Sequence, residues 1–268
     1  MSPTTLTPQQ IAQAEYFDEK YTSVIPEIDF ERYNRKRFGP WNPYWHLYNA
    51  VRELRTEQPQ RLLNIGCGKG ADALRYAKLG YAVEGIDISP RAVELSRAAA
   101  KRYGLNERAH FSVQPAESLS FPDGHFDVVV GINALHHMDT TSVIAETSRV
   151  LKPGGAAIFK EPLATPWRDR ILHSPPFTWL VPKGTKSLPK GLVYGDSEGE
   201  RNLDDTDFAL MRSSFERFTI HRWRVLACLS VLVANRPMLE RCDWTLFRML
   251  PFLRRWGDHA VLIGEQPR

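Results

Sequence analysis

The chain has 268 residues, of which 43% are hydrophobic and 25% charged, so a wholly disordered or fibrous protein is excluded. The formal net charge is +4, and residues 208–268, with ten arginines, no lysine and five acidic residues, carry all of this excess. A dedicated nucleic-acid-binding protein would concentrate more basic residues in one strong stripe. We therefore expect no nucleic-acid partner.

Cysteine usage and hydropathy indicate the cellular setting. Cys67, Cys228 and Cys242 lack C-x-x-C spacing, which argues against a disulfide framework or a zinc site, so we expect reduced thiols in a cytoplasmic protein. The first ten residues lack the basic start and apolar run of a secretory signal. The longest apolar run, residues 225–234, is about half of the ~20 residues that span a bilayer, so no transmembrane segment is predicted.

The first 58 residues predict an N-terminal helical cap. Thr7, Pro8 and Gln10 form a capping-box pattern that starts a helix ending near Tyr21, and a second helix is expected over residues 43–56. Aromatic residues are dense in this cap. They suit the packing of a small helical layer, and lining a substrate pocket is the alternative for some of them.

From residue 61 onward, short apolar runs alternate with helical stretches. This alternation predicts a parallel sheet with helices on both of its faces. Ser89 is the expected cap of one helix, and Gly104 its expected end. The expected strands are 61–65, 82–88, 109–114, 126–131 and 156–160, and the other expected helices are 71–79 and 141–151.

The alternating pattern ends after residue 161. The proline- and glycine-rich residues 162–207 predict a loop-rich insertion that acts as a substrate lid. A helix near 205–215 and strands near 217–225 and 259–264 are expected to follow, the two strands forming a hairpin-like edge.

A mixed apolar and basic stretch, residues 226–256, lies between these two strands. It predicts a helical lid with arginines that extend along apolar surface, with a hydrophobic acceptor pocket or a peripheral membrane contact as alternatives. A single domain is therefore expected, built from a cap (1–58), a core (59–161), an insertion (162–207) and the two last strands with their lid (208–268).

A glycine-rich loop and a later acidic residue predict a nucleoside site. Gly66, Gly68 and Gly70 lie where strand 61–65 turns into a helix, and glycine lets a backbone approach a ligand closely. Asp87, at the end of the next strand, can accept hydrogen bonds from two ribose hydroxyls. The G-x-G-x-G spacing, with no G-K-[ST] after it, fits neither the usual dinucleotide fingerprint nor an ATP-binding P-loop.

Four segments over residues 62–160 resemble, in the right order, the motifs of class I S-adenosylmethionine-dependent methyltransferases. The segments are LLNIGCGKGADA, VEGIDIS, AESLSFPDGHFDVVVGINALHHM and SRVLKPGGAAIF. The resemblance implies an α/β fold with a Rossmann-like seven-stranded sheet in the order 3-2-1-4-5-7-6, strand 7 being antiparallel. It also implies S-adenosyl-L-methionine as the cofactor and S-adenosyl-L-homocysteine as the product.

The same resemblance assigns residues to the cofactor. In the family, the glycine loop packs on the methionine and ribose, the acid at the end of strand 2 binds ribose, and residues just after strand 4 face the methionine end. A tyrosine in a context like FDEKY touches the cofactor in relatives. The residues carried over are Tyr21, Asn64, Gly66, Cys67, Gly68, Asp87, Ile88, Ala116, Glu117, Gly131 and Asn133.

Two positions depart from the family pattern. Asn64 stands where an acidic residue is usual, so this position can accept a hydrogen bond but brings no charge. Pro115 replaces the aspartate of a common Asp-Ala-Glu triplet, and its side chain cannot accept a hydrogen bond from the adenine amino group. Recognition of that group is left to Gln114, to Glu117 or to the backbone of Ala116.

Catalytic candidates follow the fourth and fifth parallel strands. His136 and His137 come after strand 4 and Glu161 ends strand 5, its neighbour in the family order. A histidine suits the role of general base toward a hydroxyl acceptor, and the carboxylate can orient its ring. Some natural-product sugar O-methyltransferases resemble this arrangement. A purely positional role of the histidines is the alternative.

The sequence therefore predicts a methyltransferase that acts on a small-molecule hydroxyl in a secondary metabolite, a sugar or a lipid-like acceptor. C- or N-methylation on the same scaffold and a non-catalytic cofactor-binding homologue are the alternatives. No metal is expected, because no carboxylate cluster follows the strands. His46, His173 and His221 are expected to be surface or packing groups.

Overall fold

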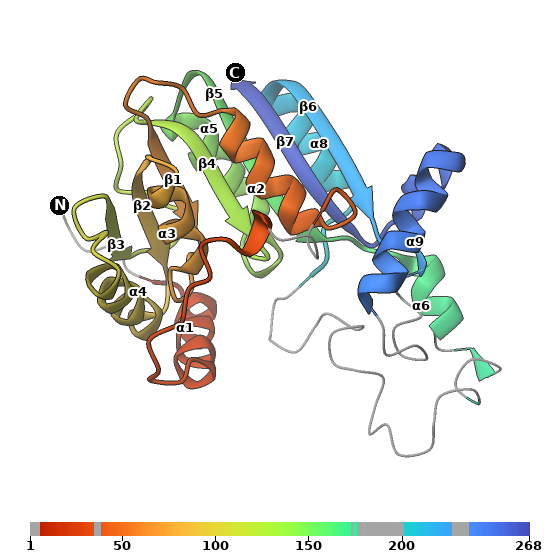
Figure 1. The fold of residues 1–268 in the computed structure, drawn as a ribbon, viewed down its shortest axis with the longest axis horizontal. Coiled ribbons are helices and arrows are strands. Elements are labelled where there is room, and N and C mark those ends of the chain that lie inside the picture. Colours follow the sequence, from red (N-terminus) through yellow and green to blue (C-terminus); the bar gives the residue numbers. More distant parts are fainter. Residues whose placement is uncertain (1–5, 35–38, 173, 176–178, 180–200, 227–235) are drawn as a thin grey trace.

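The computed structural model describes residues 6–34, 39–172, 174–175, 179, 201–226 and 236–268. Its centre is a seven-stranded sheet in the order β3-β2-β1-β4-β5-β7-β6 (Figure 1). The first five strands pair in parallel, and β7 runs antiparallel to both of its neighbours. The predicted strand order and the antiparallel seventh strand are thus confirmed.

Most strands lie close to where the sequence places them, but β5 begins at Leu151 rather than at 156, because Leu151 already pairs with Phe126 before a register shift in the β4–β5 pairing. Their bounds are β1 (Arg61–Ile65), β2 (Ala82–Asp87), β3 (Ala109–Val113), β4 (Phe126–Ile132), β5 (Leu151–Pro162), β6 (Phe215–Trp223) and β7 (His259–Pro267). The sequence places the start of β6 too late, at 217. The strand begins at Phe215 because this side chain is fully buried and its backbone pairs with Pro267.

Helices precede the first strand, connect the parallel strands and also lie between the later strands. The α-helices are α1 (Pro8–Lys20), α2 (Pro43–Glu53), α3 (Ala71–Lys78), α4 (Pro90–Arg102), α5 (Thr140–Val150), α6 (Pro166–Leu172), α8 (Asp205–Ser214) and α9 (Arg236–Met249). Short 3₁₀ helices are η1 (Arg32–Asn34), η2 (Leu135–His137) and η4 (Pro251–Trp256). The capping box at Thr7 and the Ser89 cap are both present.

Two helix predictions need correction. α2 ends at Glu53 rather than at 56, because the Gln60 side chain closes the helix end: its Nε2 donates to Leu54 O (3.0 Å) and its Oε1 accepts from Thr56 N (2.8 Å). The segment expected to be loop-rich contains the helix α6, which begins at Pro166. Proline suits the first turn of a helix, where its missing N–H is not needed.

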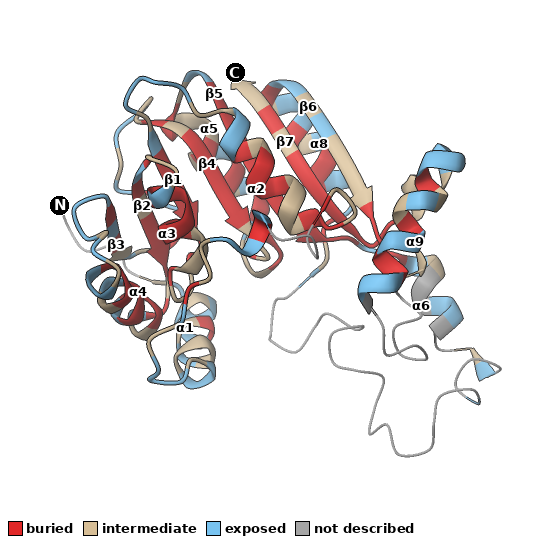
Figure 2. Ribbon diagram, viewed as in Figure 1, coloured by how far each residue is buried: buried red, intermediate tan, exposed pale blue. Residues whose placement is uncertain are grey.

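Two hydrophobic clusters cover the sheet, and the central strands between them are largely buried (Figure 2). One contains apolar side chains of α2, α3 and α4, and the other those of α5 and α8. Successive strand residues face opposite layers, as the two-residue period of a strand requires: Leu62 packs in the first layer and Leu63 in the second. Both layers leave the carboxyl ends of the parallel strands uncovered, and α1 lies beyond these ends (Figure 1).

Candidate active site

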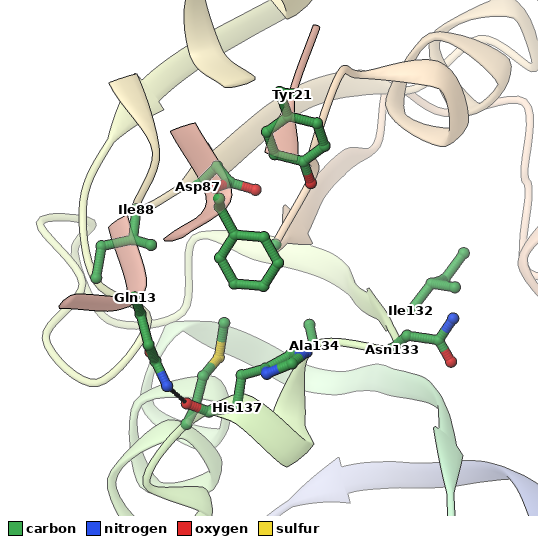
Figure 3. Close-up of a pocket in the computed structure, with 11 residues that line it drawn as sticks. Gln13, Tyr21, Asp87, Ile88, Ile132, Asn133, Ala134 and His137 are labelled. Atoms are coloured by element: carbon green, nitrogen blue, oxygen red, sulfur yellow. Dashed lines mark hydrogen bonds between the residues drawn. The ribbon is translucent and has the colours of Figure 1, made fainter. Parts of the chain in front are cut away.

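A cavity of about 250 Å³ lies where β1, β2 and β4 end, with α1 across it (Figure 3). The residues that line it are Gln13, Phe17, Tyr21, Gly66, Asp87, Ile88, Ile132, Asn133, Ala134, His137 and Met138. A smaller hollow shares Gly66, Asp87, Ile88 and Met138 with this cavity and extends it to Ala116 and Glu117. A parallel sheet with helices on both faces places its ligands at this edge.

The glycine loop gives the cavity its floor. Gly66 has φ +60°, and a Cβ there would lie 2.7 Å from Ala134 Cβ. Gly68 has φ +51°, and a Cβ there would lie 3.0 Å from the Tyr21 hydroxyl oxygen. Both positions therefore require glycine for the backbone turn, and Gly66, which lines the cavity, also leaves room for a ligand there.

Asp87 presents a carboxylate that the backbone holds in place. Its Oδ2 accepts from Gly68 N (2.8 Å) and its Oδ1 from Ser89 N (3.0 Å). Burial raises the pKa of Asp87, and these backbone hydrogen bonds oppose that effect. Each carboxylate oxygen can accept a further hydrogen bond, which is what a ribose diol would donate.

The helix α1 is fastened over the cavity at two points. Asp18 accepts hydrogen bonds from Ser89 Oγ and from Arg91 N (3.2 Å), both at the start of α4. Gln13 donates to His137 O on the other side of the cavity. Burial, followed by the charge of Asp87, raises the pKa of Tyr21 well above its usual range, so its hydroxyl stays protonated. α1 thus supplies a cover with a hydrogen-bond donor.

His136 and Glu161 form a buried pair beside the cavity. His136 Nδ1 lies 2.7 Å from Glu161 Oε2, and the two side chains are 3% and 0% exposed. Glu161 Oε1 accepts from Ala134 N (2.8 Å) and Leu135 N (3.0 Å). A carboxylate only accepts hydrogen bonds, so Nδ1 carries a proton and Nε2 is the ring nitrogen that points away from Glu161.

The two neighbouring histidines differ in position. His137 lines the cavity, whereas His136 is not among the lining residues. Their ring centroids are 4.0 Å apart, and Phe17 of α1 meets the His137 ring edge-on at 5.2 Å. The ring of His137 therefore lies between the cavity and the His136–Glu161 pair.

Several residues assigned from the resemblance lie behind the cavity rather than in it. Asn64 Nδ2 donates to Val130 O (3.2 Å), a bond that a carboxylate could not make. Cys67 is buried, and burial raises the pKa of its thiol. A Cβ on Gly131 would lie 2.7 Å from the Phe159 ring, so this glycine serves close packing of β4 on β5.

At the hollow beside Ala116, two of the three groups considered for adenine already make hydrogen bonds. The Gln114 amide donates to Ser112 Oγ (2.8 Å) and accepts from Ser120 N (3.0 Å). Glu117 accepts from Gln10 Nε2 (3.1 Å), which ties this hollow to α1.

The sequence reading missed Gln13, Phe17, Ala134 and Met138, all of which line the cavity, whereas Ile132 belongs to the stretch after strand 4 that it placed at the methionine end. Gln13 and Phe17 lie four positions apart, so the helical period places them on one face of α1. The sequence does not indicate where this helix docks. Met138 belongs to the LHHM segment itself. Its neighbours His136 and His137 were predicted as catalytic residues because they are titratable.

His46 and His221 are packing groups, as the sequence predicts. His46 packs on His221 and Trp223, with ring centroids 4.7 and 4.9 Å away, while His173 lies outside the described residues. Within the described ranges, no group of three or more His, Cys, Asp and Glu side chains is arranged to hold a metal ion. No helix in the same part of the chain combines the length and apolar character needed to cross a bilayer.

Comparison with known proteins supports one family. The model of a family described as a methyltransferase domain matches residues 63–159. The 27-O-demethylrifamycin SV methyltransferase of Amycolatopsis mediterranei is 41% identical over 108 residues, which are 40% of this chain and only 40% of that relative. The ubiquinone/menaquinone biosynthesis C-methyltransferase UbiE of Geobacter sulfurreducens is 30% identical over 242 residues, covering 84% of this chain and 90% of that protein.

Solved structures show the same fold. Geranyl diphosphate C-methyltransferase from Streptomyces coelicolor, solved with S-adenosyl-L-homocysteine, has a TM-score of 0.60 at 16% identity and covers 99% of this chain and 100% of that one. A likeness at this level of identity concerns the fold alone. It agrees with the seven-stranded sheet described above.

Proposed function

Since the chain belongs to the class I S-adenosylmethionine-dependent methyltransferases, as its match to 90% of a relative's length shows, we propose that it methylates a hydroxyl group of a small-molecule acceptor. The observation that carries this proposal is the buried His136–Glu161 pair beside the cavity, at 2.7 Å. Methylation of a hydroxyl benefits from a base that removes its proton, whereas transfer to many other groups does not.

The residues around the cavity fit S-adenosyl-L-methionine. When bound, this cofactor supplies a methyl group on a positively charged sulfur. Asp87 would bind the ribose hydroxyls, since its carboxylate is fixed by two backbone N–H groups at the cavity wall. Ile88 and Met138 would contact the adenine, and the loop at Gly66 would pass along the ribose and methionine, where its lack of a side chain leaves room.

We assign the role of base to His136 and that of its positioning residue to Glu161. The carboxylate fixes the proton on Nδ1, which leaves Nε2 able to take a proton from the acceptor hydroxyl. Glu161 in turn is held by two backbone N–H groups, so the ring cannot rotate freely. His137 lines the cavity and is the second candidate for the base.

The test compares His136→Ala with His137→Ala. Release of S-adenosyl-L-homocysteine is measured over a panel of hydroxyl-bearing acceptors, and cofactor binding is measured by calorimetry. Loss of a general base costs roughly 10²–10⁴-fold in turnover, and we expect this loss in His136→Ala with cofactor binding retained. Full turnover in both variants would exclude a histidine base, and no turnover of the wild type on any hydroxyl-bearing acceptor would favour C- or N-methylation.

Two alternatives have distinct signatures. The alternative of C-methylation is supported by the similarity to the quinone-biosynthesis relative over 84% of this chain. It predicts turnover only with acceptors that offer a nucleophilic carbon. A non-catalytic homologue predicts cofactor binding without turnover on any acceptor of the panel. In either alternative, the His136–Glu161 pair would have a positional role only.

We also propose that α9 and η4 contact an anionic membrane surface, from which a lipid-like acceptor would be drawn. Both acidic residues of α9 are buried: Asn42 Nδ2 donates to Glu240 Oε2 (3.2 Å), and Leu226 N donates to Asp243 Oδ1 (2.7 Å). The outer surface carries arginines and exposed apolar side chains, with Met249 74% and Phe252 56% exposed. This combination suits an interfacial helix.

Co-sedimentation with vesicles tests this surface. We expect binding to vesicles of phosphatidylglycerol and not to vesicles of phosphatidylcholine, and reduced binding for Phe252→Ser and Arg248→Glu. Ile11→Ser is a matched control, because Ile11 is also exposed but lies on α1. Equal sedimentation of all variants with both vesicle types, or none with either, would remove the membrane contact.

A further inference from the structure

Lys160 is a buried lysine next to the site, and it is 1% exposed. It precedes Glu161 on β5, so the two side chains point to opposite faces of the sheet. Their partners on β7 agree with this: Val261, paired with Lys160, packs in one hydrophobic cluster, and Ala260, paired with Glu161, packs in the other. Burying an ammonium group is costly unless partners accept its hydrogen bonds, so the partners of Lys160 indicate its role.

These two neighbouring residues of β5 together hold residues 133–136, which follow β4 and are called the β4 turn below. Lys160 O accepts from Asn133 N (2.8 Å), and Lys160 Nζ donates to Asn133 Oδ1 (2.5 Å). Glu161 holds the three residues after Asn133 through the hydrogen bonds described above. Lys160 therefore fixes the first residue of the β4 turn, by its backbone and by its side chain.

Asn133 is the strained residue of the β4 turn. It has φ +51°, in the left-handed region that residues other than glycine seldom adopt. Its amide is held at both ends: the oxygen accepts from Lys160, and Nδ2 donates to the Tyr44 hydroxyl (2.9 Å). Lys160 Nζ also lies 4.7 Å from the centroid of the Tyr44 ring. Strain of this kind persists only where surrounding contacts hold it, and Lys160 supplies two of these contacts.

The residue that Lys160 holds is part of the cavity wall. Asn133 and Ala134 of the β4 turn line the cavity, together with Ile132 at the end of β4 (Figure 3). In the same view, the Asn133 amide points away from Ala134 and His137, so Lys160 contacts it from behind the wall. Lys160 thus acts on the cavity through Asn133 and not by contact with a ligand.

The β4 turn offers acceptors to a ligand. Its N–H groups at Asn133, Ala134 and Leu135 all donate to β5 residues. The pairing of Ile132 with Lys160 makes the N–H of residue 162 the next donor in the parallel ladder, toward the carbonyl of residue 133. Residue 162 is proline and has no N–H. A carbonyl that the ladder leaves in this way suits an ammonium group, such as the one at the methionine end of the cofactor.

We propose that Lys160 is a positioning residue of the cofactor site, which holds Asn133 in the conformation that receives the methionine end of S-adenosyl-L-methionine. The inference rests on the proposed function, because it requires that the cavity bind this cofactor. Glu161 positions the base from one face of β5, and Lys160 positions the cofactor from the other. Two adjacent residues thereby order both partners of the transfer.

Calorimetry on the full chain tests the proposal without an acceptor. Lys160→Met keeps the long apolar stem and removes the donor to Asn133. We expect S-adenosyl-L-homocysteine to bind about tenfold more weakly, the factor that one lost hydrogen bond of this kind gives. Methylthioadenosine shares the adenine, ribose and sulfur of this ligand but lacks its amino-acid end. It should bind Lys160→Met and the wild type equally.

Lys152→Met is the matched control. Lys152 lies at the other end of β5, where it pairs with Asp127 (2.8 Å), so its loss should leave the affinity for both ligands unchanged. Thermal unfolding of each variant is measured in parallel. It separates a loss of affinity from a loss of stability, which is all that a merely structural lysine would cause.

A double-mutant cycle with Asn133→Gly shows whether the lysine acts through the β4 turn. Glycine adopts a positive φ without strain, so this backbone should not need the lysine. In the Asn133→Gly background, Lys160→Met should leave the affinity for S-adenosyl-L-homocysteine unchanged. Should Lys160→Met alone fail to fold, Tyr44→Phe takes its place, because it keeps the lysine and removes the acceptor at the other end of the amide. It should give a smaller loss of affinity, which Asn133→Gly also abolishes.

Three results would overturn the inference. They are equal binding of S-adenosyl-L-homocysteine by the wild type and Lys160→Met, an equal loss for both ligands, and a loss that persists in the Asn133→Gly background. Each of them leaves the proposed function intact, because the wild type still binds the cofactor product. A wild type that binds neither ligand would remove the proposed function and this inference together.

Discussion

At the ends of β1 and β2, the cavity is shaped by backbone. Glycine dihedral angles, the Gly68 and Ser89 N–H groups and one fixed carboxylate, Asp87, form what we call the cofactor side. At the ends of β4 and β5 lies what we call the acceptor side, where buried titratable side chains, Lys160, Glu161 and His136, do the positioning. Backbone groups need no charge compensation, whereas each buried ion needs a partner. The two sides should therefore respond differently to mutation.

The largest effect is expected from Glu161→Ala on the acceptor side. The change leaves the Ala134 and Leu135 N–H groups and His136 Nδ1 without their acceptor in a buried site. Removing one partner of a buried pair costs about 3–5 kcal/mol of stability, and turnover should fall with it. Thermal unfolding of Glu161→Ala beside Asp139→Ala, a more exposed carboxylate, measures the cost. Equal stability of the two variants would contradict the view that buried charge organises this side.

Asp87→Asn should act mainly on binding. The amide can still accept from one backbone N–H, so we expect the fold to persist. A hydrogen bond to a charged group is worth about 1.5–3 kcal/mol, which corresponds to roughly 10- to 150-fold weaker binding of S-adenosyl-L-methionine. Calorimetry measures this, with Asp127→Asn as a control at the opposite end of the strands, where Asp127 pairs with Lys152. Unchanged affinity in Asp87→Asn would remove this residue from the cofactor site.

Gly66→Ala and Gly124→Ala form a matched pair. Their φ angles are +60° and +59°, so the backbone strain of adding a Cβ, about 1–2 kcal/mol, is shared. Only Gly66 is also crowded, by Ala134 Cβ at 2.7 Å, while nothing lies within 4 Å at Gly124. We expect a larger loss of melting temperature in Gly66→Ala, where the clash adds to the shared strain, and a loss of cofactor affinity in Gly66→Ala alone. Equal affinities would show that the loop does not contact the cofactor.

The smallest effect concerns pH and lies outside both sides. Burial lowers the pKa of His46 to about 4 from an ordinary value of 6.5, with the nearby His221 as a second cause. The unfolded chain binds a proton between these values and the folded chain does not, so stability is full above 6.5 and falls as pH drops toward 4. His46→Gln should reduce this fall. The melting temperatures of the wild type and of His46→Gln at pH 7 and pH 5 measure this effect. An identical fall in melting temperature in both proteins would show that His46 does not cause it.

Much of the fold could be predicted from local pattern. Alternating strands and helices specify the parallel sheet, and the caps at Thr7 and Ser89 are local hydrogen bonds that a sequence motif encodes. The misplaced start of β6 has a non-local cause, namely the burial of Phe215 and its pairing with Pro267. Element bounds set by distant partners are not visible in a short window of sequence.

The site residues likewise divide into those that a local motif predicts and those that depend on distant contacts. Gly66, Asp87 and Ile88 follow from a strand-loop-helix motif in which each residue's neighbours in sequence are also its neighbours in space. Gln13 and Phe17 line the same cavity, but they arrive there only because Asp18 fastens α1 to the start of α4. The docking of α1 depends on contacts across about seventy positions in the chain, which local pattern cannot indicate.

The sequence by itself indicated the parallel sheet and the cofactor side, because glycine turns and strand-end acids act through local backbone geometry. The strand order and the identity of the cofactor followed from the resemblance of four motifs to a known family. Only the tertiary structure decided which of His136 and His137 meets Glu161, since the two rings leave the backbone in different directions. It alone turned Lys160 from an ordinary strand residue into the partner of Asn133 and the neighbour of Tyr44. Buried charges interact according to distance in space, and distance along the chain does not report it.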